Sequence, residues 1–293
     1  MDIAVIDIGG TSIKYGLYTD GVISNVRETP TEAKKGGEHI VNKLIELLGT
    51  YEHFDRIGIS TAGQVNSDTG SIIYANPNIP NYTGTKIKER LQEHYNVPIA
   101  VLNDVNAAAI GECSFGVGRK LKDKSFLCLT YGTGIGGAIV ENGKIYNGSG
   151  YSAAEFGAIL THSSERDAEK DIMSGCYERY ASTTALVRYA KEIYPEIQNG
   201  RDIFAKRDDE KMREVIDRWT DEIVYGLVTL THIFNPSAIV LGGGVMGQSF
   251  LVDIIDKKLR QNIMSSFAGV ELFAAESGNN AGMLGAGFTA QNI

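Results

Sequence analysis

The sequence has few cysteines, no long apolar run and no excess of positive charge, and each shortage excludes a class of protein. The three cysteines, Cys113, Cys128 and Cys176, include no C-x-x-C pair, so neither a disulfide framework nor a zinc ribbon is encoded. We expect Cys113 and Cys128 to be reduced packing residues. Apolar runs such as 238–241 are far shorter than the roughly 20 residues that a membrane-spanning helix needs.

The net charge and the first seven residues exclude two further classes of protein. The net charge is −8, and the lysines and arginines are scattered along the chain, which argues against a nucleic-acid surface. Residues 1–7 lack the basic, then apolar, then small-residue order of a secretory signal. We therefore expect a cytoplasmic protein that acts on a small molecule. Its 293 residues, 43% of them hydrophobic, are enough for one large or two medium domains.

Two stretches of the chain share the order strand, glycine turn, strand, turn. In the first, residues 3–7 lead into Gly9, Gly10 and Thr11, and residues 12–18 follow. In the second, 126–144, the glycine turn is Gly132, Thr133 and Gly134. A shift of 122 residues places Gly10 on Gly132 and Thr11 on Thr133. This match predicts an internal duplication of one supersecondary unit, with two related halves that face each other.

The other expected elements alternate between helix and strand. Apolar spacing predicts helices at 39–48, 85–95 and 211–234, and short buried strands at 56–60, 99–102 and 238–241. The pattern indicates an α/β chain with two sheet-centred lobes. Since no linker is rich in proline or glycine, we expect lobes that hinge rather than separate.

The glycine clusters are candidates for phosphate binding. Backbone N–H groups and a threonine hydroxyl can converge on an anion at each turn. A single cluster is more often a tight hairpin turn, and it is the two related copies with a third cluster that favour a nucleotide. The spelling G-x-G-x-x-G occurs at 132–137 and 242–247. The first is followed by a strand where the dinucleotide fingerprint needs a helix. The second follows a strand near the C-terminal end, so a nicotinamide enzyme is disfavoured but stays open.

Two acids stand at the ends of expected strands. Asp7, beside the first glycine turn, suits a divalent cation that accompanies phosphates, or it simply forms the turn. Asp104, after the strand 99–102, is placed where open α/β sheets bind ligands, or it caps the helix through Ala107 to Glu112. Nothing in the sequence around Glu155 and Glu178 distinguishes them from ordinary surface acids.

Five motifs in order resemble the ROK family of sugar kinases and repressors across nearly the full chain. They are Asp7–Thr11, Asn103–Ala108, Tyr131–Gly137, Glu155–Gly157 and Leu241–Val245. The resemblance implies an actin-like, hexokinase-type fold with duplicated ribonuclease H-like lobes, ATP and sugar in the cleft between them, and a homodimer. The expected lobes are 1–118, completed by a C-terminal helix at 281–293, and 119–280.

The resemblance also assigns roles to residues. It implies that Asp104 is the general base at the sugar hydroxyl, that Asn103 binds the sugar beside it, and that Asp7 lies near the Mg²⁺ of MgATP. Phosphates are expected at both glycine turns and the adenosine near Gly243 and Gly244. Sugar contacts are expected from Gly63, Asn78, Glu155 and Glu178.

One departure from the family concerns zinc. The family's zinc ligands, a histidine and three cysteines, correspond here to Ala158, Glu169, Asp171 and Cys176. One thiolate cannot supply a tetrahedral zinc site, so we expect no zinc, a segment 161–173 ordered by other contacts, and His162 as a loop histidine.

In the family, the histidine that Ala158 replaces also reaches the sugar near its anomeric end. Its replacement removes a hydrogen-bond donor and opens space there, which favours a β-glucoside or disaccharide phosphorylated on its 6-hydroxyl. N-acetylmannosamine kinase and glucokinase remain alternatives, as does a sensor that binds sugar without turnover. A repressor of this family carries a DNA-binding domain before the first glycine turn, and the six residues before Asp7 leave no room for one.

Overall fold

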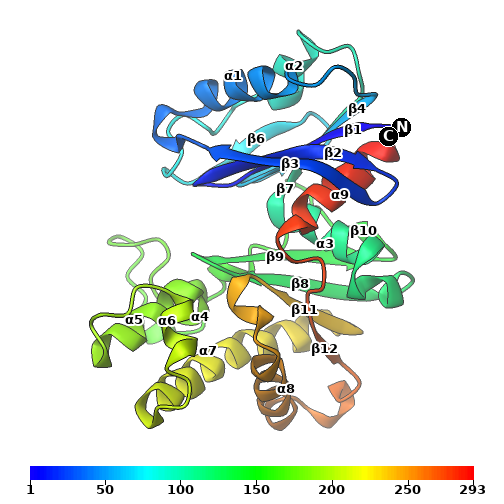
Figure 1. The fold of residues 1–293 in the computed structure, drawn as a ribbon. Helices are drawn as coiled ribbons and strands as arrows, with labels where there is room; N and C mark the ends of the chain where they lie inside the picture. Colours follow the sequence, from blue (N-terminus) through cyan, green and yellow to red (C-terminus); the bar gives the residue numbers. More distant parts are fainter. The chain divides into compact units, whose positions relative to one another are not determined.

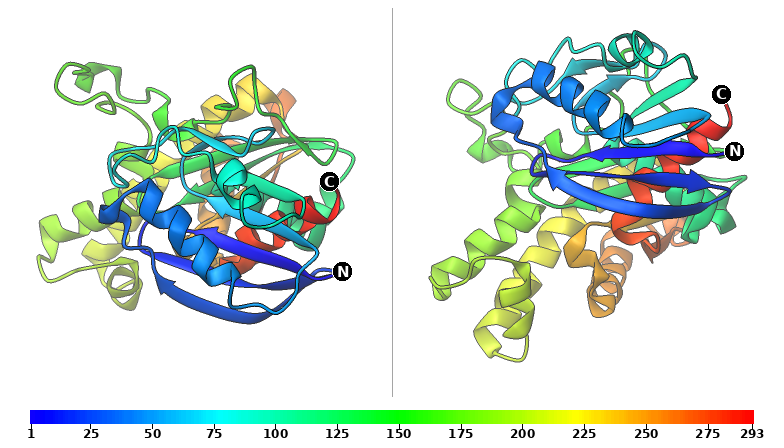
Figure 2. Two further views of the ribbon diagram at one scale, coloured as in Figure 1. Left: turned by 90° about the horizontal axis from the view of Figure 1, so that it is seen from above. Right: turned by 45° about the horizontal axis from the view of Figure 1, so that its top comes forward.

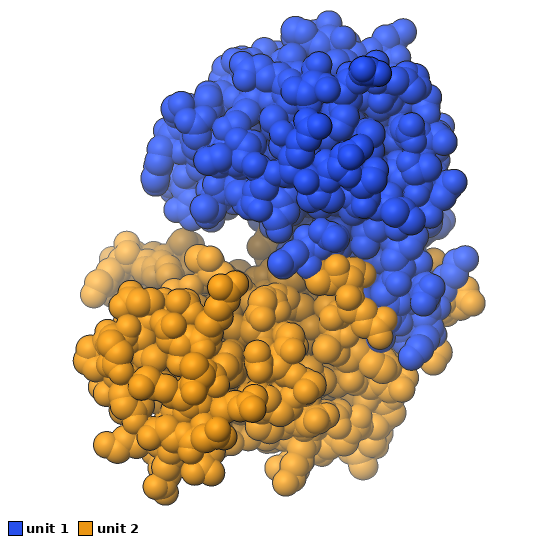
Figure 3. Space-filling model, viewed as in Figure 1, with its two compact units in different colours: residues 1–122, 143–153, 279–293 blue, residues 123–142, 154–278 orange.

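The computed structural model describes residues 1–293, which form two compact units. Unit 1 contains residues 1–122, 143–153 and 279–293, and unit 2 contains residues 123–142 and 154–278 (Figure 3). Each unit is built around its own sheet. None of the helices combines the length and hydrophobicity that crossing a bilayer requires.

The sheet of unit 1 has the strand order β3-β2-β1-β4-β7. β1 pairs antiparallel with β2 and parallel with β4, and β4 pairs parallel with β7. A separate hairpin joins β5 and β6. The strands of this sheet and hairpin are β1 (Ile3–Ile8), β2 (Ser12–Thr19), β3 (Val22–Pro30), β4 (Arg56–Thr61), β5 (Gln64–Asn66), β6 (Ser71–Tyr74) and β7 (Ile99–Asn103). The short β10 (Lys144–Ile145) also falls in unit 1 but belongs to neither of them.

Alternation along β1 determines what covers each face of this sheet. Ala4 and Ile6 belong to the core beneath α1 (Gly37–Leu48) and α2 (Ile87–Gln92), whereas Ile3 and Val5 pack against α9 (Ala281–Gln291). Successive side chains of a strand point to opposite faces. Figures 1 and 2 show α1 and α2 on one side of the sheet and α9 on the other.

Small residues allow α9 to lie directly against α3 (Asp104–Phe115). A Cβ added at Gly285 would overlap the Ala107 carbonyl oxygen, and one added at Gly111 would overlap the Ala281 carbonyl oxygen. Only glycine permits backbones to approach this closely. The contact holds a helix from the C-terminal end of the chain against the N-terminal sheet.

Unit 2 contains the strands in the order β9-β8-β11-β12. Inward-facing residues of β8, β9 and β11 pack against α5, α7 and α8, and the indole of Trp219 on α7 donates to the Ala181 and Ser182 carbonyls. The elements are β8 (Ser125–Tyr131), β9 (Ile135–Glu141), β11 (Ala238–Gly242), β12 (Glu271–Ala274), α4 (Glu178–Ala181), α5 (Thr183–Ile193), α6 (Gly200–Ala205), α7 (Glu210–Phe234) and α8 (Ser249–Asn262).

The elements expected from periodicity are present, with one clear difference in length. α2 ends at Gln92 rather than continuing to residue 95, although the Tyr95 N–H still donates to the Leu91 carbonyl at 2.9 Å. The Tyr95 hydroxyl donates to the Ile45 carbonyl at 2.8 Å. Both duplicated stretches are antiparallel strand pairs joined by their glycine turns. Because β9 follows Gly134, the spelling at 132–137 leads into a strand, which excludes the dinucleotide fingerprint there.

Candidate active site

Polar residues of unit 1 gather where three parallel strands end. Asp7 on β1 lies opposite Ser60 on β4, and Thr61 on β4 lies opposite Asn103 on β7. Asp104 follows Asn103 as the first residue of α3. Ligands of open α/β sheets bind at this carboxyl edge, so the register alone brings the two expected acids to one place.

Asn103, rather than Asp104, caps α3. Its Oδ1 accepts hydrogen bonds from the N–H groups of Val105 and Asn106 at 2.9 and 3.0 Å. Its Nδ2 donates to Asp104 Oδ1 at 2.9 Å and to the Gly63 carbonyl at 3.0 Å. The capping interpretation of Asp104 is therefore wrong. Asp104 Oδ1 also accepts from the Val105 N–H at 2.9 Å, so Oδ2 is the carboxylate oxygen that stays available for chemistry.

Burial raises the pKa of Asp104 to about 6, and the negative charge of Asp7 adds to this rise. Burial likewise raises the pKa of Asp7, whereas the Ser60 hydroxyl and Lys14 lower it. A carboxyl group that changes protonation just below neutral pH is suited to act as a general base. A cation near Asp7 would favour the charged form of both acids.

Two residues that sequence reasoning missed support this edge. The Ser60 hydroxyl is fully buried and donates to Asp7 Oδ1 at 2.6 Å. The Tyr82 hydroxyl is 2.7 Å from Thr61 Oγ1, and both residues are buried. The charge of Asp104 contributes to a rise in the pKa of Tyr82, after the larger effect of burial. The only sequence signal for Ser60 was its position at the end of a buried strand.

The expected sugar residues Gly63 and Asn78 have different positions. Gly63 has a positive φ of 98° and its carbonyl accepts from Asn103, so it adjoins the acid pair. Asn78 is exposed, and its N–H donates to Asn76 Oδ1 at 3.1 Å. The contacts of Asn78 are thus local.

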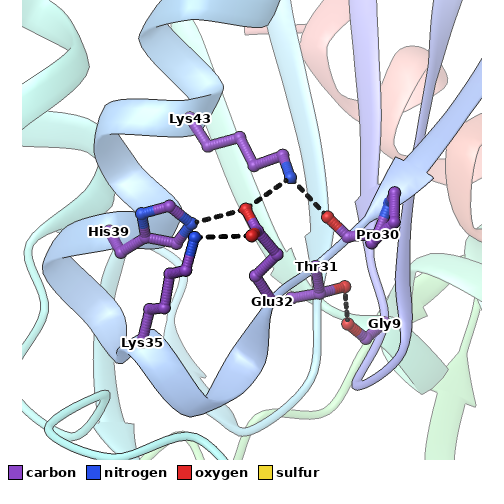
Figure 4. Close-up of polar contacts among 7 residues, drawn as sticks. All are labelled: Gly9, Pro30, Thr31, Glu32, Lys35, His39 and Lys43. Atoms are coloured by element: carbon purple, nitrogen blue, oxygen red, sulfur yellow. Dashed lines mark hydrogen bonds and ion pairs between the residues drawn. The ribbon is translucent and has the colours of Figure 1, made fainter.

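The first glycine turn links β1 to β2 and is bonded from one side by Thr31. The Thr31 hydroxyl donates to the Gly9 carbonyl at 2.6 Å, and the Thr31 N–H donates to the Thr11 carbonyl at 2.9 Å (Figure 4). A Cβ added at Gly10 would meet no atom within 4 Å. The space above Gly10 is therefore open to a ligand.

The second glycine turn, in unit 2, adjoins the third glycine cluster. Gly243 has a positive φ of 100°, and a Cβ added there would overlap the Tyr131 carbonyl oxygen immediately before Gly132. A Cβ added at Gly132 or at Gly244 would meet nothing within 4 Å. The structure therefore brings together the residues expected near phosphate and near adenosine in this unit.

Glu178 lies against the same turn. Its Oε2 accepts from the Ile135 N–H at 3.4 Å, and a Cβ added at Gly134 would lie 2.5 Å from it. Burial raises the pKa of Glu178, and the charge of Glu155 contributes a smaller rise. Glu155 is exposed and begins the turn that contains Ala158. The two glutamates thus affect each other electrostatically, which sequence alone did not show.

The segment that corresponds to the family's zinc region is ordered by Arg166. Its Nη1 lies 2.6 and 2.9 Å from the Ile172 and Ser174 carbonyls and 3.4 Å from Cys176 Sγ. No group of three or more His, Cys, Asp or Glu side chains is arranged to hold a metal ion.

His162 has more contacts than a loop histidine. Its ring stacks on that of Tyr180 with centroids 3.7 Å apart, and its Nε2 lies 3.4 Å from a Glu222 carboxylate oxygen. The loop assignment is correct for the backbone, but the side chain is anchored.

Comparison with known proteins gives one consistent result. The family described as "ROK family" matches residues 3–293. An uncharacterized protein of Clostridium perfringens is 37% identical over 97% of this chain and 95% of its own length. A β-glucoside kinase of Listeria monocytogenes is 32% identical over 98% of this chain and 96% of its own length.

Solved structures agree in fold over the whole chain. A ROK family glucokinase from Streptomyces griseus, in complex with glucose and AMPPNP, has a TM-score of 0.85 and 29% identity and covers all of both chains. A putative N-acetylmannosamine kinase from Listeria monocytogenes has a TM-score of 0.88 and 28% identity, and the match covers 100% of this chain and 99% of that one. The hexokinase-type two-lobe fold expected from the sequence is confirmed.

Proposed function

Because the chain belongs to the ROK family and is a ROK sugar kinase, we propose that it transfers the γ-phosphate of ATP to the 6-hydroxyl of a glucose-type sugar. The preferred acceptor is a β-glucoside such as cellobiose or gentiobiose. The observation that carries the proposal is the acid pair of unit 1, in which Asp104 has a pKa of about 6 beside Asp7.

Asp104 is the general base of the proposed reaction. Oδ1 already accepts two hydrogen bonds, so Oδ2 takes the proton of the sugar 6-hydroxyl. The hydroxyl oxygen then bonds to the γ-phosphorus, the bond from that phosphorus to the β,γ-bridging oxygen breaks, and ADP leaves. Asn103 fixes the Asp104 carboxylate through Nδ2, and it would bind the sugar by exchanging its second Nδ2 bond, to the Gly63 carbonyl, for a sugar oxygen.

Charge neutralisation completes the proposed chemistry. Phosphoryl transfer depends mainly on positioning and on neutralising the phosphate oxygens. Mg²⁺ enters with ATP as part of that substrate, and Asp7 binds near it. Gly10 and Thr11 in unit 1, and Thr133 and Gly134 in unit 2, supply amides to phosphates. Gly9 and Gly132 shape the two turns, since their N–H groups donate to the Ser12 and Gly134 carbonyls at 3.0 Å. Gly243 and Gly244 border the adenosine.

The choice of a β-glucoside rests on Ala158. This residue ends the short turn that begins with Glu155, is exposed, and carries only a methyl group. In the proposed assignment Glu155, Glu178, Gly63 and Asn78 bind sugar hydroxyls, and Ala158 leaves room for a substituent on O1. Similarity to a named β-glucoside kinase supports the assignment, whereas similarity to a glucokinase and a putative N-acetylmannosamine kinase keeps those activities as alternatives.

We include two expectations from the resemblance in the proposal. The functional lobes are residues 1–118 with the helix at 281–293, and residues 119–280. The active protein is a homodimer, which sedimentation velocity of the purified protein would test.

The test is ADP release with MgATP over a panel of glucose, cellobiose, gentiobiose, salicin, fructose, N-acetylglucosamine and N-acetylmannosamine. We expect turnover of the β-glucosides to exceed that of free glucose. Ala158→His should lower turnover of cellobiose more than that of glucose, because the imidazole refills the space at O1. If only a free monosaccharide is turned over, the assignment as a sugar kinase stands and the assignment to β-glucosides is wrong.

A variant of the base distinguishes the kinase from a sugar sensor. Asp104→Asn keeps the shape of the side chain and removes its ability to take a proton, so we expect turnover to fall by about 100-fold or more. Sugar binding, measured by calorimetry, should persist. Unchanged turnover would remove Asp104 as the base, and absence of turnover in the unmodified protein would favour the sensor.

A further inference from the structure

Threonines from elsewhere in the same unit bond the carbonyl groups of both glycine turns. In unit 1 these donors are the hydroxyl and the N–H of Thr31. In unit 2 the Thr184 hydroxyl donates to the Thr133 carbonyl at 2.8 Å, and the Thr183 N–H donates to the Gly132 carbonyl at 3.0 Å. Each turn is therefore restrained through its carbonyl oxygens.

The restrained carbonyls correspond to one another in the two copies. The shift of 122 residues places Thr11 on Thr133, and both of these carbonyls accept a threonine donor. It places Gly9 on Tyr131, whose carbonyl accepts from the Thr183 hydroxyl at 3.1 Å. The same shift would place Thr31 on Ala153. Equivalent carbonyls of the two copies are thus hydrogen-bonded by threonines. These threonines do not occupy corresponding positions in the two copies.

Peptide geometry gives these bonds a consequence. A planar trans peptide points its N–H opposite to its C=O. Fixing the Gly9 carbonyl therefore directs the Gly10 N–H the other way, and fixing the Thr133 carbonyl does the same for the Gly134 N–H. A carbonyl oxygen facing a phosphate would repel it, whereas successive N–H groups attract an anion.

We propose that Thr31 and Thr184 are positioning residues for nucleotide phosphates. Each hydroxyl holds a carbonyl on the far side of its glycine turn and so keeps the next amide directed at phosphate. The inference rests on the proposed function, in which both turns bind phosphate, and adds residues outside the glycine motifs to that task.

The surroundings of Thr31 hold it in place. Thr31 is fully buried. Before it, the Pro30 carbonyl accepts from Lys43 Nζ at 2.5 Å. After it, the Glu32 carboxylate contacts Lys35, His39 and Lys43 (Figure 4). Glu32 has a left-handed φ of 54°, a conformation that non-glycine residues rarely adopt, so the surrounding contacts must stabilise it.

The experiment compares Thr→Val, which keeps the size and removes the hydroxyl, with Thr→Ser, which keeps the hydroxyl. The variants are Thr31→Val, Thr31→Ser, Thr184→Val and Thr184→Ser. Thr229→Val is the matched control, because Thr229 is an exposed residue of α7 and its hydroxyl donates to the Tyr225 carbonyl of the same helix. Calorimetry measures the dissociation constant of Mg·ADP, and steady-state kinetics with the best sugar separates KM for MgATP from KM for sugar.

We expect each valine variant to raise the Mg·ADP dissociation constant and KM for MgATP by about three- to tenfold, as loss of one hydrogen bond implies. The serine variants and Thr229→Val should match the unmodified protein, and KM for sugar should not change. Thr184 is exposed, so its valine variant is a valid test even if Thr31→Val fails to fold.

The inference is overturned by unchanged Mg·ADP binding in Thr184→Val, by equal losses in the serine and valine variants, or by an equal rise in KM for sugar. If the unmodified protein binds Mg·ADP but phosphorylates no sugar, the proposed function fails while calorimetry still decides the inference. If the unmodified protein does not bind Mg·ADP, the inference fails.

Discussion

The Ser60 hydroxyl donates to the Asp7 carboxylate across 2.6 Å, from the residue directly opposite on the neighbouring parallel strand. The bond is buried on the serine side, and it fixes one oxygen of Asp7. The other oxygen can then face a cation in a single orientation. Ser60, which takes no part in the chemistry, thus determines the orientation of the Asp7 carboxylate toward the cation.

Ser60→Ala should therefore increase the Mg²⁺ requirement. Loss of the hydrogen bond raises the pKa of Asp7 further and frees its carboxylate to rotate, so we expect the Mg²⁺ concentration for half-maximal activity to rise by about tenfold, the scale of a hydrogen bond to a charged group. Titration of activity with Mg²⁺ at fixed ATP measures this. An unchanged midpoint would show that Ser60 does not position Asp7.

The pH dependence should follow Asp104. The base works only when deprotonated, and burial with the neighbouring Asp7 raises its pKa to about 6. We expect kcat/KM for sugar to fall as pH drops through a midpoint at or below about 6, since the Mg²⁺ of MgATP near Asp7 favours the charged form of Asp104, and to level off above it. A rate profile from pH 5 to 8 checks this, with a saturating coupling system at each pH. A profile that stays flat down to pH 5 would contradict the assignment.

Arg166→Ala should expose the Cys176 thiol. All three cysteines are buried and none forms a disulfide, and Arg166 links Cys176 Sγ to the Ile172 and Ser174 carbonyls. We expect one thiol to become rapidly reactive toward Ellman's reagent, against none in the unmodified protein. Adding Cys176→Ser should abolish the new signal. Arg213→Ala, at an exposed position of α7, is the control and should leave all thiols protected.

Gly285→Ala should destabilise unit 1. An added methyl group would overlap the Ala107 carbonyl oxygen across the α3–α9 contact, and overpacking of this kind costs about 1–3 kcal/mol or more. Urea unfolding measures the change. Gly150→Ala is the matched control, because a Cβ there meets nothing within 4 Å. Equal stability of the two variants would show that the helices can separate without cost.

Local sequence predicted the elements that depend on local signals. Periodicity located β1 and β7, because their β-branched runs favour a strand. It located α7 in the same way, because a long apolar stripe favours an amphipathic helix. Boundaries were weaker, as at α2, which ends at Gln92 although Tyr95 still bonds the Leu91 carbonyl through its N–H. The sequence left open whether Asp104 caps α3 or faces a ligand, because asparagine and aspartate have nearly equal capping preference.

The supporting residues of the site could not be predicted in the same way. Ser60 meets Asp7 across 53 residues of sequence, and Thr31 meets Gly9 across 22. Serine and threonine are common in every kind of segment, so only the sheet register reveals which of them face an acid or a carbonyl. The electrostatic effect of Glu155 on Glu178 depends in the same way on a fold that no short motif encodes.

The division of the chain has a consequence for how the protein is made. Unit 1 takes its last helix from residues 279–293, whereas the stretch 154–278 of unit 2 is synthesised before them. A ribosome releases the N-terminal sheet early, with one face lacking the helix that covers Ile3 and Val5. Domains otherwise tend to fold in the order of synthesis. Here α9 covers that face only after the stretch 154–278 has been made, so Ile3 and Val5 stay uncovered by their helix while unit 2 is synthesised.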